Sequence, residues 1–139
     1  MIAYQEDLAG IAPRHLRGFF AGWPNPPSPQ THYRLLRGSQ NVVLARDERA
    51  GPVVGFITAV GDGVLCADIP LLEVLPAYQG QGIGTEWVRR MLAQLQEYYM
   101  VDLLCDPELQ PFYERLGMRR ATGMMVRRYA RQSGAPGTG

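Results

Sequence analysis

Three glycines at alternate positions, Gly80, Gly82 and Gly84, stand between a stretch typical of a strand and a stretch with helical periodicity. Glycine lets a backbone bend sharply or come close to a ligand, and the first amide groups of a helix attract anions. The pattern therefore predicts a phosphate-binding loop where the helix begins. A tight strand-to-helix turn without a ligand has the same local sequence, so both interpretations stay open at this point.

The spacing of these glycines excludes the two common nucleotide-binding motifs. A dinucleotide fingerprint GxGxxG would need glycine where the chain has Thr85 or Trp87. A P-loop needs a lysine, and all 14 Lys and Arg positions of this chain are arginine. The lack of lysine also excludes a lysine nucleophile.

The composition is that of one soluble globular domain. The chain has 139 residues, 46% of them hydrophobic, and a net charge of +1, which favours neither nucleic acid nor a membrane surface as partner. No apolar run is long enough to span a membrane, and the N-terminus lacks a signal peptide, so we expect a cytoplasmic location. Cys66 and Cys105 lie in apolar runs, and we expect buried free thiols there rather than a disulfide or half of a metal site.

Periodicity and turn residues predict a mixed order of helices and strands. Ser28 followed by Pro29 is a typical helix start, and the helix between residues 64–75 and 100–105 predicts that these two strands run parallel. We expect one domain over residues 1–131 and a flexible tail over 132–139. The expected elements are a short helix or two half-helices at 6–20, a helix at 28–38, antiparallel strands at 41–46, 53–60 and 64–75, a helix from 83, a strand at 100–105, a helix at 106–116 and a strand at 124–129.

Two stretches resemble the GNAT superfamily of N-acetyltransferases. VLPAYQGQGIGT, residues 74–85, is similar to the acetyl-CoA pyrophosphate loop with its signature Gln/Arg-x-x-Gly-x-Gly/Ala, and LLEVLP before it is similar to the family's fourth strand. PFYERLGM, residues 111–118, resembles the second signature, around a helix that ends in glycine. The resemblance covers residues 41–129 well and the first forty residues loosely.

This resemblance implies an α+β fold in three layers, α/β/α. A mixed sheet of about six strands would be flanked by about four helices, with a splayed parallel pair between the fourth and fifth strands. In the family, pantetheine lies in that gap and pairs with exposed backbone groups like an added strand. The donor implied is acetyl-CoA, used as a cosubstrate.

The resemblance also implies which residues bind acetyl-CoA. The backbone of Val74 and Leu75 would bind the pantetheine amides, and the amides of residues 79–85 would bind the pyrophosphate. Asp106 stands where many relatives have Asn near the cofactor, although its carboxylate could instead cap the next helix. The full implied set is Val74, Leu75, Gln79, Gly80, Gln81, Gly82, Ile83, Gly84, Thr85 and Asp106.

Acetyl transfer to an amine needs a group that accepts a proton and a group that donates to the leaving thiolate. By resemblance, Tyr113 is the acid beside the cofactor sulfur, unless it only packs at a helix end. Asp68 falls where some histone-acetylating relatives have a catalytic glutamate, but it could merely end a strand. Glu73 could be a solvated or salt-bridged carboxylate. His15 and His32 are expected at the surface, and water could carry the proton instead of any single base.

The acceptor would bind near the proline-rich loop and the first helices, which vary most in the family. Trp23, His32 and Tyr33 could line a site for an aromatic or cationic amine, although Trp23 could simply pack the loop onto the domain. A faint further likeness is to plant and bacterial members that acetylate arylalkylamines or proteins. It favours an arylalkylamine slightly over other amines.

The function implied is direct acetyl transfer from acetyl-CoA to a primary amine of a small molecule or protein, without a metal. An alternative is an acyl-CoA-binding regulatory module without turnover. A nucleotide-binding βαβ protein with Asp102 as its ribose-binding carboxylate is disfavoured by the three antiparallel strands before the loop. The resemblance allows a homodimer through the sheet edge or the terminal strand.

Overall fold

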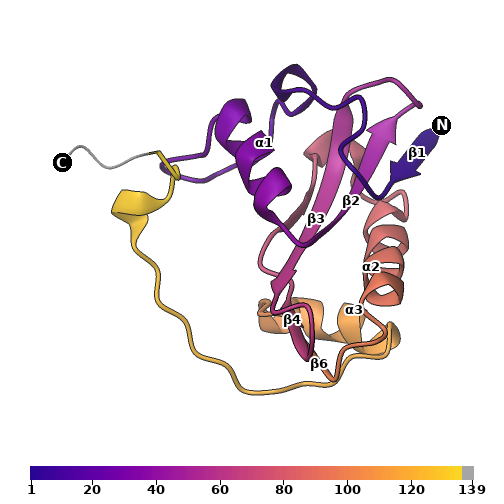
Figure 1. Ribbon diagram of the computed structural model, residues 1–139, viewed down its shortest axis with the longest axis vertical. Coiled ribbons are helices and arrows are strands. Elements are labelled where there is room, and N and C mark those ends of the chain that lie inside the picture. The colour runs from indigo at the N-terminus through magenta and orange to yellow at the C-terminus, as the bar shows by residue number, and fades with distance from the viewer. Residues whose placement is uncertain (136–139) are drawn as a thin grey trace.

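A computed structural model describes residues 1–135 of the chain as one mixed sheet with helices on both faces (Figure 1). Its strands are β1 (Ile2–Gln5), β2 (Asn41–Asp47), β3 (Val53–Gly61), β4 (Cys66–Asp68), β5 (Leu72–Val74) and β6 (Met100–Asp102). Its α-helices are α1 (Pro29–Gly38), α2 (Ile83–Gln94) and α3 (Gln110–Arg115). Short 3₁₀ turns lie at Pro13–His15, Pro76–Tyr78, Pro107–Leu109 and Tyr129–Arg131.

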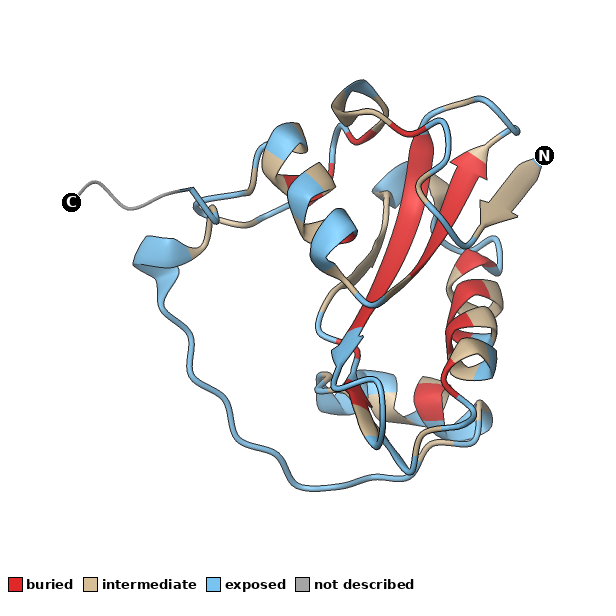
Figure 2. Ribbon diagram, viewed as in Figure 1, coloured by how far each residue is buried: buried red, intermediate tan, exposed pale blue. Residues whose placement is uncertain are grey.

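The sheet has six strands in the order β1-β2-β3-β4-β6, and β5 pairs with β3. All pairs are antiparallel except β4 with β6, which run parallel. In Figure 1, α1 lies on one side of β2 and β3 and α2 on the other. Figure 2 shows that β2 and β3 are the most buried strands. The predicted α+β sheet with a parallel pair is confirmed.

The two longest helices form as their sequences predict. The Ser28 hydroxyl accepts a hydrogen bond from the Thr31 amide at 3.1 Å, and Pro29 occupies the first turn of α1. Helix α2 buries four residues at helical spacing against the sheet, namely Ile83, Trp87, Val88 and Met91. Among residues 1–135, the longest α-helix has 12 residues, and none has the length and apolar character that a membrane crossing requires.

The predicted third strand, residues 64–75, is instead two strands. Residues 64 and 65 belong to a turn in which the Asp62 carboxylate accepts hydrogen bonds from the amides of residues 64, 65 and 66. β4 and β5 are then separated by residues 69–71, where Pro70 has no N–H to donate to a ladder. β4 pairs with the end of β3 and β5 with its beginning, so the interruption lies at the centre of the sheet.

Two other expected elements, the helix at residues 6–20 and the strand at residues 124–129, are wrong. Residues 6–20 form only a 3₁₀ turn, Pro13–His15, and the N-terminal strand β1 was not predicted. The strand expected at residues 124–129 is absent, because that segment lies against no other strand within residues 1–135. Of the tail expected to be flexible, residues 136–139 lie outside the described residues, while the Gln132 side chain accepts a hydrogen bond from the Asn25 amide at 2.9 Å.

Candidate active site

The parallel strands β4 and β6 separate immediately after their last paired residues. Asp68 is in register with Asp102, and the Ile69 amide donates to the Asp102 carbonyl at 2.9 Å. From there β5 pairs only with β3, and residues 103–105 belong to no strand. β5 therefore has one edge that pairs with no strand within residues 1–135, and the space beside this edge is here called the gap.

Hydrogen-bond alternation decides which backbone groups of β5 face this gap. The Thr58 amide donates to the Leu71 carbonyl at 3.0 Å and the Leu75 amide donates to the Val54 carbonyl at 2.9 Å, so Leu71 and Leu75 point toward β3. Backbone groups alternate in direction along an antiparallel strand, so the N–H and C=O groups of Leu72 and Val74 face away from β3.

Val74 therefore presents its backbone groups to the gap, whereas the Leu75 amide is already paired. The Leu75 carbonyl is paired as well, because it accepts a hydrogen bond from the Tyr78 amide at 2.8 Å. The Gln79 side chain donates to the Val74 carbonyl at 3.1 Å and so bridges the glycine loop to the gap. Leu72, which the sequence did not single out, is the second residue of β5 with backbone groups on this side.

The glycine loop is exposed and ends at an uncapped helix start. Gly80 and Gly82 both have φ of 82°, and a Cβ at either would meet no atom within 4 Å. Glycine is thus required at these two positions by the left-handed backbone conformation and not by neighbouring atoms that would clash with a side chain. α2 has no side-chain cap, and the amides of Ile83, Gly84 and Thr85 in its first turn have no hydrogen-bond partner within residues 1–135. Such amides can bind an anion.

The two sequence motifs touch each other in the structure. A Cβ placed on Gly84 in the first turn of α2 would lie 3.8 Å from the Phe112 ring of α3. The first turn of α2 and the Phe112 ring of α3 therefore lie close together, and Tyr113 follows Phe112 in the chain. Tyr113 lines a hollow of about 600 Å³ whose wall also includes Asp68, Asp102, Cys105 and residues 118–124.

Tyr113 is buried, with 6% of its surface exposed, and its ring packs edge-on against Phe112 with centroids 5.0 Å apart. Burial, with a smaller contribution from Cys105, raises the pKa of its phenol to about 12. The phenol therefore stays protonated across the physiological range and can donate a hydrogen bond into the hollow.

Asp68 and Asp102 form an acidic pair where the strands separate. Both are exposed at the ends of their strands and both line the hollow with Tyr113. Partial burial, and then repulsion from Asp102, raises the pKa of Asp68. Asp102 was missed as part of the site, although parallel pairing of residues 64–75 with 100–105 placed the two carboxylates at neighbouring strand ends.

Asp106 does not cap the next helix, and the two cysteines are less buried than the sequence predicted. Asp106 is exposed and precedes the 3₁₀ turn Pro107–Leu109, and its side chain makes no capping hydrogen bond. Cys66 and Cys105 are free thiols, but both are half-buried. Within residues 1–135, no three His, Cys, Asp or Glu side chains are grouped so that they could hold a metal ion.

Glu73 of β5 binds the segment that leads into the proline-rich loop of residues 22–30. Its two carboxylate oxygens accept hydrogen bonds from the Phe20 amide at 2.9 and 3.0 Å. Phe20 has φ of 64°, a left-handed conformation that this contact helps to maintain. Burial raises the pKa of Glu73, and the hydrogen bonds from Phe20 and Ala21 oppose that shift. Glu73 is thus neither freely solvated nor salt-bridged.

A second hollow of about 440 Å³ lies between this loop, α1 and the C-terminal turn. Its wall is largely apolar, and Trp23 packs against Phe20 there with ring centroids 4.8 Å apart. The wall consists of Phe20, Trp23, Pro27, Thr31, Arg34, Leu35, Leu71, Gln132 and Gly134. One residue of this wall, Leu71, immediately precedes β5.

His32 is a buried core residue and not the surface residue that was expected. Only 1% of its surface is exposed, and its ring packs among Phe19, Phe20 and Phe56. Both ring nitrogens are buried without a hydrogen-bond partner in the described residues, and burial lowers the pKa of His32 to about 4. His15 uses Nδ1 to accept a hydrogen bond from the Ala12 amide at 3.0 Å, and burial lowers its pKa.

The buried imidazole makes stability depend on pH. Below the ordinary histidine pKa of 6.5 the unfolded chain takes up a proton that the folded chain does not, until the pH approaches about 4. The free energy of unfolding should therefore fall by about 2.5 kcal/mol between pH 7.5 and pH 4.5 through this residue alone. Urea denaturation at both pH values measures the change. His32→Leu, which keeps an apolar side chain in the cluster, should lose this part of the pH dependence, and an equal fall in both proteins would contradict the assignment.

Comparison with known proteins places this arrangement among known acetyltransferases. The profile of the Acetyltransferase (GNAT) family matches residues 8–118. A Deinococcus radiodurans R1 protein assigned to the acetyltransferases is 50% identical in sequence to this chain. Its crystal structure matches the fold with a TM-score of 0.92, and the match covers 98% of this chain and 94% of that one.

Two curated relatives match more distantly. The "Uncharacterized N-acetyltransferase ycf52" of Pyropia yezoensis is 28% identical over 69% of this chain and 57% of its own. The chloroplastic serotonin N-acetyltransferase 2 of Oryza sativa subsp. japonica is 29% identical over 83% of this chain and 60% of its own. The chain thus spans somewhat more than half the length of these relatives. The family profile matches most of the chain, and the Deinococcus structure matches nearly all of it. This chain therefore belongs to the GNAT family of acetyltransferases.

Proposed function

We propose that this chain transfers the acetyl group of acetyl-CoA directly to a primary amine. The observation that carries the proposal is the gap beside β5, which has the free amides of α2 at one end and Tyr113 in the adjoining hollow. Acetyl-CoA supplies an activated thioester carbonyl, which the amine nitrogen attacks as the carbon–sulfur bond breaks. GNAT enzymes use this donor, and the residues around the gap fit it.

The residues that would contact acetyl-CoA are described in order from its pyrophosphate to its pantetheine. The unpaired amides of residues 83–85 and the left-handed backbone at Gly80 and Gly82 would hold the pyrophosphate. The Val74 backbone would pair with pantetheine, and the Gln79 side chain that now donates to the Val74 carbonyl would move aside.

Proton transfer is assigned to the groups in the first hollow. The acceptor amine must lose a proton, and we assign its uptake to Asp68, directly or through water, with Asp102 raising the basicity of its neighbour. Tyr113 would donate a hydrogen bond to the sulfur as negative charge develops there. The proton released by the amine would end on the thiol.

The second hollow is proposed to hold the body of the acceptor. Phe20, Trp23 and Leu71 offer an apolar surface that suits an aromatic or alkyl group, and the positive Arg34 disfavours an ammonium inside. The amine end would then point toward the gap. The name of the rice relative, serotonin N-acetyltransferase 2, agrees with an arylalkylamine as acceptor.

Trp23→Ala should raise the KM for an arylalkylamine about 10-fold, because a buried aromatic contact is lost. The Kd for acetyl-CoA should stay unchanged, since Trp23 lies in the other hollow. Initial rates with tryptamine measure the effect, and ethylamine is the matched control because it has no ring to contact Trp23. An equal rise in KM for both amines would contradict the placement of the acceptor.

The activity itself is tested by incubating the protein with acetyl-CoA and a panel of arylalkylamines, aliphatic amines and peptide N-termini. We expect release of free thiol with at least one amine, together with mass gain on that amine. If calorimetry shows acetyl-CoA binding while every amine fails, the chain is a cofactor-binding module without turnover. If acetyl-CoA does not bind, the assignment of the glycine loop is wrong.

A further inference from the structure

The glycine loop makes few contacts of its own. Residues 79–82 are exposed, and a Cβ at Gly80 or Gly82 would meet no atom within 4 Å. None of the amides of residues 80–82 donates to a backbone carbonyl within residues 1–135. The conformation of the loop therefore depends on the residues that fix its two ends.

The two ends of the loop are fixed in different ways. After the loop, Ile83 begins α2 and is buried in the core. Before the loop, Tyr78 ends the 3₁₀ turn Pro76–Tyr78, and its ring packs against the same hydrophobic core. The Tyr78 hydroxyl also donates a hydrogen bond to the Asp47 carboxylate at 2.6 Å. This bond raises the pKa of Tyr78, so the hydroxyl keeps its proton at neutral pH.

Asp47 is itself held in place by the sheet. It is the last residue of β2, it is in register with Ile2 of β1, and its amide donates to the Pro52 carbonyl at 3.0 Å. The turn after β2 closes tightly, because a Cβ at Gly51 would clash with the Asp47 carbonyl oxygen. The Asp47 carboxylate is therefore a fixed anchor for Tyr78, which lies 31 positions later in the chain.

The other side-chain hydrogen bond at this end of the loop is lost when pantetheine binds as proposed. The Gln79 side chain donates to the Val74 carbonyl at 3.1 Å, and this carbonyl faces the gap that pantetheine would occupy. Once Gln79 moves aside, the bond between Tyr78 and Asp47 still ties the start of the loop to the sheet.

We propose that Asp47 and Tyr78 are positioning residues for CoA binding, because their hydrogen bond holds the start of the glycine loop in the conformation that receives the diphosphate. The inference rests on the proposed function, in which this loop is the pyrophosphate site. Without the bond the loop would sample more conformations, and binding would have to order it. Neither residue lines the hollow with Tyr113, so the pair acts on affinity and not on the chemical step.

The test is the Kd for CoA, measured by calorimetry on the full chain. Tyr78→Phe keeps the ring against the core and removes the hydroxyl, so the Kd should rise about 5-fold. Asp47→Ala removes the acceptor and should raise the Kd by the same factor. The two changes break one bond, so the combined variant should also show a rise of about 5-fold and not of about 25-fold.

The charge of Asp47 by itself would have the opposite effect. A carboxylate repels a diphosphate, so loss of the charge alone would tighten CoA binding in Asp47→Ala. Asp47→Asn removes the charge but keeps a side-chain oxygen that can accept the bond from Tyr78, so its Kd should stay within about twofold of the unchanged protein. Tighter binding in Asp47→Ala, or equal weakening in Asp47→Asn and Asp47→Ala, would overturn the proposal.

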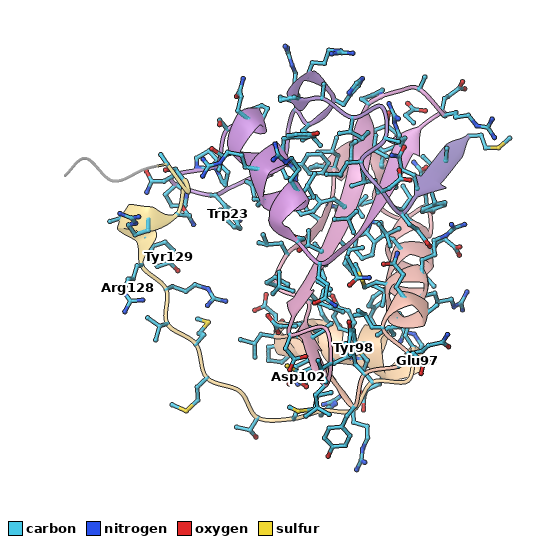
Figure 3. The ribbon with its side chains drawn as sticks, viewed as in Figure 1. Trp23, Glu97, Tyr98, Asp102, Arg128 and Tyr129 are labelled. Atoms are coloured by element: carbon cyan, nitrogen blue, oxygen red, sulfur yellow. The ribbon has the colours of Figure 1, made fainter. Side chains whose placement is uncertain are left out.

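The matched control is the hydrogen bond that the Gln40 side chain donates to the Tyr98 hydroxyl. Figure 3 shows Tyr98 near the lower end of the view, whereas β1, which pairs with the end of β2 that carries Asp47, lies near the top. Tyr98→Phe removes a tyrosine hydroxyl bond in the same way and should leave the Kd for CoA unchanged.

Thermal unfolding of the same variants separates positioning from stability. A role in stability alone would lower the melting temperature of Tyr78→Phe and leave its Kd for CoA unchanged, and that result would overturn the proposal. An equal rise in Kd for Tyr98→Phe would do so as well. Failure of the unchanged protein to bind CoA would instead overturn the pyrophosphate site of the proposed function, and this inference with it.

Discussion

Tyr113→Phe is expected to lower kcat for acetyl transfer about 100-fold while leaving the Kd for acetyl-CoA within about twofold. The phenol is buried beside the gap, and its pKa of about 12 keeps it protonated. A thiol has a reference pKa of about 8.5, so the phenol keeps its proton and stabilises the leaving sulfur by a hydrogen bond. The phenol donates no hydrogen bond within residues 1–135, so removing it leaves no acceptor there unpaired.

The matched control is Tyr98→Phe. Tyr98 accepts a hydrogen bond from the Gln40 side chain and does not line the hollow with Tyr113, so loss of its hydroxyl should leave kcat unchanged. Stopped-flow or steady-state thiol release measures kcat, and calorimetry measures the Kd for acetyl-CoA. Equal rates for Tyr113→Phe and the unchanged protein would remove Tyr113 from the reaction. A second sign is the pH–rate profile, in which the Tyr113 phenol should produce no alkaline limb below pH 10.

Gly82→Ala should weaken acetyl-CoA binding by about 10-fold or more. A residue with a Cβ is strained by roughly 1–2 kcal/mol at the φ of 82° found for Gly82. Because nothing packs within 4 Å of that position, the free loop can relax to a different backbone conformation. Binding must then restore the left-handed turn, so the strain appears in the Kd.

Gly63→Ala is the control for this substitution. Gly63 has φ of 75° and open space around it, but it lies in the turn between β3 and β4 and not in the glycine loop. It should strain its own turn by about the same amount, roughly 1–2 kcal/mol, while leaving the Kd for acetyl-CoA unchanged. Calorimetric titration of both variants separates the two effects. If the two substitutions weaken binding equally, the loop of residues 79–84 is not the pyrophosphate site.

Local sequence signals predicted the parts of the fold that neighbouring residues determine. The cap at Ser28, the apolar spacing of α2 and the glycines before it act within one or two turns of chain, and all three lie where they were expected. Tyr113 and Asp68 were identified from motif position, and the structure places both in one hollow. The helix expected at residues 6–20 does not form, because the helix propensity of this segment is weak and Pro13 limits it to a 3₁₀ turn.

Features that depend on distant segments could not be predicted from the sequence. The burial of His32 depends on Phe19, Phe20 and Phe56 converging around it from other elements. The role of Glu73 depends on a loop more than fifty residues earlier in the chain, whose Phe20 amide it accepts. Backbone pairing of Leu75 with Val54 made Val74, and not Leu75, the residue that faces the gap.

The sequence by itself indicated the family through the resemblance of two motifs, and it determined the glycine loop and the places of α1 and α2, which follow from local backbone preferences and short-range periodicity. Only the tertiary structure decided which strand edges are open, which carboxylates meet and which side chains line the two hollows. The physical reason is that strand pairing and burial are satisfied between segments far apart in the chain. A strand such as that expected at residues 124–129 forms only where another strand edge is available to pair with it.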